Sequence, residues 1–116
     1  MEIAKRQRPL DYRLRDNLRK RLSKALKGHP RVAPAHELLG CSWRHFKKHL
    51  ESQFTEGMSW ENYGEWHVDH IHPLMTYDLT KRGQQRQAFN YKNLRPLWGD
   101  ENRKRVKKVR PEYGMD

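Results

Sequence analysis

The first third of the chain carries apolar residues at helical spacing on a strongly basic background. Leucines recur every four residues, at Leu10, Leu14, Leu18, Leu22 and Leu26. This spacing predicts an amphipathic helix over about residues 10–27, which Gly28 and Pro30 should end. Because an α-helix has about 3.6 residues per turn, the leucine stripe should wrap around the helix axis.

Two further helices are predicted before residue 60. We expect a short helix over residues 34–39, closed by Gly40, and a longer one over about residues 43–54, capped by Ser42. Four apolar residues share one side of the longer helix and are explained by core packing: Trp43, Phe46, Leu50 and Phe54. The turn-rich connector 58–64 should pack its rings on the rest of the protein.

The second half of the chain changes from helical spacing to alternation. Residues 66–71 and 94–98 predict two short strands, and Pro96 requires the second to be an edge strand or to contain a bulge. The excursion between them should hold a short helix near residues 84–89. A last helix is expected over about residues 101–108, capped by Asp100. This order of elements predicts an α+β fold.

The composition predicts a thin hydrophobic core, and the net charge predicts a polyanionic partner. The chain has 116 residues, 34% of them hydrophobic, and a mean hydropathy of −1.22. Its 25 Lys and Arg against 14 Asp and Glu give a net charge of +11 and an isoelectric point near 10.1. Such a surplus favours nucleic acid over a merely solvated basic surface.

Other features exclude some classes of protein. There is no apolar run long enough to span a bilayer, so no membrane partner is expected, and the N-terminus lacks the apolar segment of a secretion signal. The single cysteine, Cys41, cannot form an internal disulfide and is interpreted as a packing residue rather than a nucleophile.

The residues around the first strand carry the candidate chemistry. Hydrolysis of a phosphodiester needs a base for water and positive charge for the phosphate. A neutral histidine such as His70 can supply the first, and a cation held by oxygen ligands such as Asp69 can supply the second. Side chains of adjacent strand residues point to opposite faces, but at a strand end or bulge both can border one site. Asn102 would lie near the start of the last helix, where backbone N–H groups favour a phosphate.

Three segments in order resemble the HNH endonucleases, in particular small phage-type members. They are Trp-His-Val-Asp-His-Ile-His-Pro at residues 66–73, Tyr-Lys-Asn-Leu-Arg-Pro-Leu-Trp at residues 91–98, and Asn102. The similarity spans about residues 42–105. It implies a ββα-metal catalytic core over residues 42–116 with a basic helical N-terminal extension over residues 1–41.

The resemblance also implies residue roles. Asp69 and Asn102 match the metal ligands, and His70 matches the general base. Asn93 matches the asparagine that fixes the loop and orients this histidine. The implied ion is Mg²⁺ or Mn²⁺.

The chain departs from the family pattern in several places. His67 and His72 flank the central pair, and each could be an additional ligand, a phosphate contact or a packed residue. Extra imidazoles could also admit Zn²⁺, Ni²⁺ or Co²⁺. The Cys-x-x-Cys zinc staples found in some members are absent, and Arg105 stands where the family usually has Lys.

Cations near the motif are candidate DNA contacts, namely Arg95, Arg103, Lys104, Arg105, Lys107 and Lys108. The basic face of the first helix could extend this footprint through Arg13, Arg15, Arg19 and Lys20. The remaining histidines, His29, His36, His45 and His49, are interpreted as structural or solvated.

These observations predict a metal-dependent DNA endonuclease that nicks or cuts duplex DNA with weak sequence preference. The alternatives are a non-catalytic DNA-binding module on the same scaffold, an RNA-directed nuclease and a homing endonuclease. If the chain is phage-encoded, it would act in the cytoplasm of a bacterial host, with packaging proteins such as a terminase as candidate partners. The sequence leaves the oligomeric state and the cut pattern open.

Overall fold

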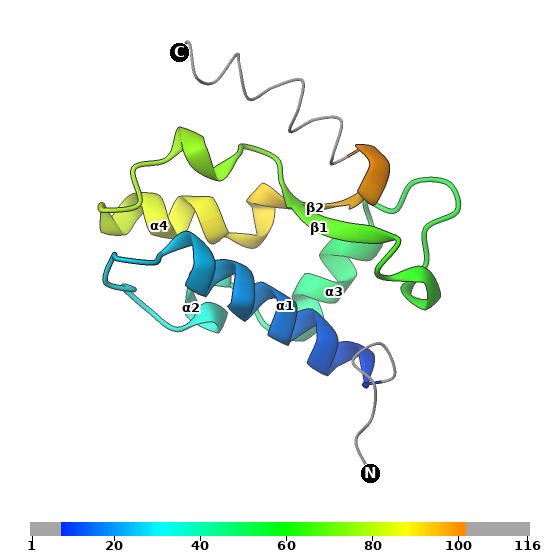
Figure 1. Ribbon diagram of the computed structural model, residues 1–116. Coiled ribbons are helices and arrows are strands. Elements are labelled where there is room, and N and C mark those ends of the chain that lie inside the picture. The colour runs from blue at the N-terminus through cyan, green and yellow to red at the C-terminus, as the bar shows by residue number, and fades with distance from the viewer. Residues whose placement is uncertain (1–7, 102–116) are drawn as a thin grey trace.

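A computed structural model of the protein describes residues 8–101, and residues 1–7 and 102–116 are not described (Figure 1). Helices and a small sheet form one mixed fold, which confirms the predicted α+β class. The principal elements are α1 (Leu10–Ala25), α2 (Ala35–Leu39), α3 (Trp43–Glu51), β1 (Trp66–His70), α4 (Arg82–Phe89) and β2 (Leu94–Trp98). The described residues also contain three short 3-10 turns, η2 (Trp60–Asn62), η3 (Leu74–Thr76) and η4 (Tyr91–Asn93).

The sheet consists of the two predicted strands, β1 and β2, paired antiparallel. In this register Trp66 faces Trp98, Val68 faces Pro96 and His70 faces Leu94. Alternate residues of β1 are buried and half-buried, so one face of the hairpin meets the core and the other is partly open to solvent. Both strands are edge strands, which is the position that Pro96 requires.

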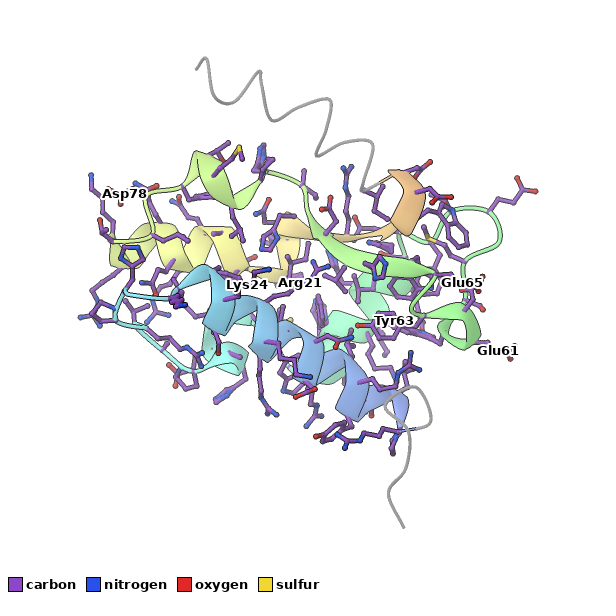
Figure 2. The ribbon with its side chains drawn as sticks, in the orientation of Figure 1. Arg21, Lys24, Glu61, Tyr63, Glu65 and Asp78 are labelled. Atoms are coloured by element: carbon purple, nitrogen blue, oxygen red, sulfur yellow. The ribbon has the colours of Figure 1, made fainter. Side chains whose placement is uncertain are left out.

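Backbone carbonyls on the outer edges of the hairpin receive hydrogen bonds from elsewhere in the chain. The guanidinium of Arg21, on α1, donates to the Val68 carbonyl, and Figure 2 shows Arg21 on the side of α1 next to the sheet. The Leu94 carbonyl lies 3.1 Å from the His49 ring nitrogen Nε2 on α3. The Gly64 N–H donates to the Trp66 carbonyl at 3.0 Å.

Most helix limits follow the predicted capping residues. Gly40 ends α2 in the left-handed conformation, with φ of 76°, and Ser42 accepts a hydrogen bond from the His45 N–H at the start of α3. The first helix ends at Ala25 and α3 at Glu51, two and three residues earlier than expected. Helical backbone resumes at residue 99, so Asp100 lies inside this segment and the prediction that it caps the helix is wrong.

The larger part of the core joins α1 and α3 to the sheet. Leu14 and Leu18 of α1 and Phe46 of α3 pack in one cluster with Trp66 and Leu94. Aromatic rings of the connector close this cluster, as expected, since the Tyr63 and Trp60 rings lie 4.9 and 5.3 Å from the Trp66 ring. The expected N-terminal extension thus shares its core with the hairpin, and the division at residue 41 stays a prediction.

A second cluster lies between the end of α1, α2 and α4. It contains Leu22 and Leu26, Leu38 of α2, and Ala88 and Phe89 of α4. Figure 1 shows α2 and α4 next to each other at one end of the molecule. No helix within residues 8–101 is long and apolar enough to cross a membrane.

Candidate active site

Asp69 lies on the partly open face of β1, directly opposite Arg95 of β2. The Asp69 side chain is 13% exposed, and its Oδ2 atom lies 3.5 Å from Nε of Arg95. His67 is two residues earlier on the same strand and is also half-buried. The hairpin therefore places a carboxylate, an imidazole and a guanidinium on one face.

His70 is the last residue of β1, and its side chain lies on the core face, opposite to that of Asp69. Only 7% of His70 is exposed, and its Nε2 atom is buried. The ring packs edge-on against Phe89 of α4, with 5.3 Å between centroids. No bulge brings the two side chains to one face, so they can meet a common phosphate only around the end of the strand.

Asn93 joins three parts of the chain immediately beside His70. Its Oδ1 atom accepts a hydrogen bond from the His72 N–H at 2.9 Å. Its Nδ2 atom donates to the His72 carbonyl at 3.2 Å and to the Ala88 carbonyl at 3.0 Å. The Asn93 carbonyl also accepts from the Ile71 N–H at 2.7 Å. This buried carboxamide fixes the loop that leaves β1 to both β2 and α4.

The two additional imidazoles lie in different surroundings. His67 lines a cavity of about 360 Å³ between α1 and β1, together with Lys20, Arg21 and Tyr63. His72 is exposed and lines a hollow of about 490 Å³ beside Lys92 and Asn93. The described structure therefore does not bring His67 and His72 together as a pair of ligands.

The rest of the expected site lies outside the described residues. Residues 99–101 are helical and follow β2 directly, with the Gly99 N–H donating to the Glu65 carbonyl at 3.0 Å. Several predicted residues come after this point and are not described, namely Asn102, Arg103, Lys104, Arg105, Lys107 and Lys108. Within residues 8–101, no group of three His, Cys, Asp or Glu side chains is arranged to hold a metal ion.

Some side chains that shape the site were not predicted to do so. Arg21 of α1 donates a hydrogen bond to the Val68 carbonyl, but it was not among the candidate residues predicted on this helix. Phe89, which contacts the His70 ring, was expected in a helix but not at the site. Both contacts join residues far apart in sequence, and no local pattern could have indicated them.

Cys41 and His49 behave as expected for residues outside the chemistry. Burial raises the pKa of the Cys41 thiol, which disfavours the reactive thiolate. His49 lies edge-on to Tyr91, with 5.0 Å between ring centroids, and holds α3 to β2 through the Leu94 carbonyl.

Comparison with known proteins places the chain beside two proteins of Acanthamoeba polyphaga mimivirus. It is 40% identical over 104 residues to "Uncharacterized protein L426", which covers 89% of this chain and 46% of that protein. It is 39% identical over 95 residues to "Uncharacterized protein L246", and the match covers 81% of this chain and 42% of that protein. The chain thus spans less than half the length of these relatives. No family model and no solved structure matches it.

Proposed function

We propose that this chain is a metal-dependent endonuclease of the HNH type that hydrolyses phosphodiester bonds in DNA. The observation that carries the proposal is the Asn93 clamp, by which we mean the three hydrogen bonds of the Asn93 side chain to His72 and Ala88. These bonds tie the loop after the Asp69–His70 pair to β2 and to α4. The order of an antiparallel hairpin followed at once by helical backbone supports it as well.

His70 acts in this proposal as the base that takes a proton from water. Because its Nε2 atom is buried, Nδ1 is the nitrogen assigned to this task. Contact with Phe89 and the adjacent Asn93 clamp restrict where the ring can lie. A base fixed in this way keeps its orientation toward the phosphate throughout the reaction.

Asp69 is the proposed ligand for a divalent ion, with Asn102 as its second protein ligand. A single carboxylate plus a carboxamide is a set of oxygen donors, which suits Mg²⁺ or Mn²⁺. His67, on the same face of β1, would add a nitrogen donor and admit a softer ion. Once bound, the ion would neutralise charge on the phosphate and on the leaving oxygen.

Arg95 supplies the cation nearest to the proposed ligand. Its side chain is 35% exposed and lies beside Asp69 on the open face. In the absence of a substrate it balances the carboxylate. With DNA present, we propose that the guanidinium turns to a phosphate oxygen, a geometry to which its fork of donors is suited.

The test is conversion of supercoiled plasmid with Mg²⁺, Mn²⁺ or EDTA, comparing wild type with His70→Ala and His45→Ala. His45 is an exposed histidine of α3 and serves as the matched control. We expect metal-dependent cleavage to fall by at least about 100-fold in His70→Ala alone. Nicked product would indicate one site per molecule, and linear product two. Equal cleavage by all three proteins would contradict the role of His70.

The non-catalytic DNA-binding module is the second candidate, and the Asp69–Arg95 contact favours it. Within residues 8–101, Asp69 is balanced by a cation and belongs to no group of three His, Cys, Asp or Glu side chains that could hold a metal ion, which is also expected of a scaffold that has lost its metal site. Plasmid binding without cleavage in any divalent ion would establish this alternative in place of the nuclease.

A further inference from the structure

Two hollows border the helices α2 and α4, and Asp69 lines neither of them. The first, of about 800 Å³, is lined by Arg15, Trp43, Arg44 and Arg86 among others. The second, of about 490 Å³, is lined by residues that include His72, Tyr77, Arg86 and Lys92.

The two hollows are neighbours on the surface, and together they are called the groove. Arg86, exposed on α4, lines both. Gly40 borders the first hollow and Asn90 the second, and a Cβ atom on Gly40 would lie only 2.8 Å from Nδ2 of Asn90. Because these two walls touch, the hollows lie side by side near the junction of α2 and α4. The groove ends at His72, two residues after the proposed base His70. The backbone of His72 is held by the Asn93 side chain.

The charge of the groove is positive and largely unbalanced. Arg15, Arg44, Arg86 and Lys92 line it, against the single carboxylate of Glu37. Within the described part of the chain, neither Arg44 nor Arg86 forms an ion pair, whereas Lys20 and Lys47 do. A row of exposed cations without acidic partners attracts a polyanion.

Aromatic rings line the groove together with these cations. Trp43 lines the first hollow and Tyr77 the second, and both are half-buried. The Arg15 guanidinium already lies over the Trp43 ring, 5.2 Å from its centroid. A groove lined by both cations and rings fits the phosphates and bases of an unpaired strand, because bases stack on aromatic and guanidinium planes. A duplex would present only its phosphates.

We propose that this groove binds single-stranded nucleic acid. The strand runs from Arg44 past Arg86 to His72 and Lys92, with phosphates on the cations and bases against the rings. The groove ends beside the loop that follows His70, so a bound strand would be delivered to the cleavage site. This step rests on the proposed nuclease function. The substrate would then be DNA with an unpaired branch or end, rather than a uniform duplex.

The test is the affinity for a fluorescent single-stranded oligonucleotide in EDTA, measured by anisotropy over a range of salt concentrations. The variant Arg44→Gln/Arg86→Gln removes two groove cations, and the α1 variant, Lys24→Gln/Lys27→Gln, removes two exposed cations at and just after the C-terminal end of α1, outside the groove. Circular dichroism verifies the fold of each protein. A hairpin duplex of equal charge is the competing ligand.

We expect the groove variant to bind the oligonucleotide about 20-fold more weakly than wild type at about 0.1 M salt. The slope of log affinity against log salt concentration should fall in magnitude by about 1.4. The affinity of the α1 variant should stay within about twofold of wild type. Equal losses in both variants, or no loss in the groove variant, would overturn the groove. Duplex binding as tight as single-strand binding, with the same dependence on Arg44 and Arg86, would overturn the assignment to unpaired strands.

Plasmid cleavage separates this proposal from the nuclease function. If the groove variant loses affinity but wild type cuts no DNA with any divalent ion, the groove is supported and the nuclease is not. If wild type cuts DNA while the groove variant binds like wild type, the nuclease stands and the groove is overturned.

Discussion

Two buried carboxamides perform the same structural task in different regions of this protein. Asn93 fixes the loop after β1, through His72 and Ala88. Gln85, only 1% exposed, fixes two other loops: its Nε2 atom donates to the Pro30 and Leu79 carbonyls, and its Oε1 atom accepts from the Val32 N–H.

The neighbours of the two carboxamides differ, although their bonding does not. Asn93 precedes Leu94, the partner of His70 at the end of β1, whereas Gln85 lies on α4 beside Ala88 and Phe89 of the second cluster. A buried, fully bonded amide is therefore no indication of catalysis by itself. What distinguishes Asn93 is the histidine whose loop it fixes, and this difference can be measured.

The largest effect should follow from Asn93→Ala. Losing both bonds to His72 lets the loop and the His70 ring shift, and a misplacement of about 1 Å costs about 100-fold in rate. Plasmid cleavage under single-turnover conditions measures this. Gln85→Ala is the matched control and should cleave like wild type. Unchanged cleavage by Asn93→Ala would remove the distinction between the two amides.

Gln85→Leu should reduce the free energy of unfolding by about 3 kcal/mol, because it leaves polar backbone groups of two loops without partners. Urea denaturation measures this, and cleavage well below the transition should be unaffected. A loss of cleavage equal to that of Asn93→Ala would mean that both amides support the site.

Arg95→Gln removes the cation beside Asp69 and should make metal binding tighter. For a half-buried carboxylate at the partly open face, one charge at about 4 Å contributes at least about 1 kcal/mol, or about fivefold in affinity. The Mg²⁺ concentration for half-maximal cleavage should fall accordingly. Lys47→Gln, which breaks the ion pair with Asp11 instead, should leave it unchanged. No change in Arg95→Gln would argue against Asp69 as the ligand.

Tyr63 should make the first cluster sensitive to alkali. Burial raises the pKa of its hydroxyl, against the lowering effect of the Asn17 hydrogen bond and of nearby arginines. The neutral form is thus favoured in the folded state, and stability present below about pH 10 is lost as the pH rises further. Tyr63→Phe should cost about 1 kcal/mol at neutral pH through the lost Asn17 bond, but show no such alkaline decline in thermal melts.

The smallest effect concerns Asp78, in the loop that Gln85 holds. Hydrogen bonds from the Thr80 hydroxyl and N–H lower the pKa of this exposed carboxyl. Its stabilising effect is present above about pH 4 and is lost as the pH falls. Thr80→Val should be slightly less stable than wild type at neutral pH and equal to it near pH 2 by urea denaturation. A difference that persists in acid would point to a cause other than ionisation.

The two pH-sensitive groups, Asp78 and Tyr63, lie in well-separated parts of the molecule (Figure 2).

Local sequence patterns predicted the elements well because each carries its own signal. The leucine spacing, Gly40, Ser42 and the two alternating segments all correspond to elements or caps in the structure. The start of the last helix was predicted too late, since an acidic residue such as Asp100 suits the first turn of a helix as well as its cap.

The site was predicted less completely, for a physical reason. Asn93 lies where the motif places it, beside the loop that follows His70. The face to which each side chain points, however, depends on strand regularity. The regular end of β1 separates Asp69 from His70. The ring contact with Phe89 and the Arg21 bond to Val68 depend on tertiary packing, which no spacing along the chain encodes.

The closed edges of the small sheet limit how this protein can associate with others. Pro96 has no N–H, and it faces Val68 across the ladder, so β2 offers no donor at this point of its outer edge. The outward carbonyls of Trp66, Val68 and Leu94 already accept bonds from Gly64, Arg21 and Gln53. A two-stranded sheet finished in this way is a poor template for a third strand, which disfavours edge-to-edge aggregation of a thin-cored protein. Any assembly, with a second copy or with the remainder of a longer polypeptide, must use side-chain surfaces instead.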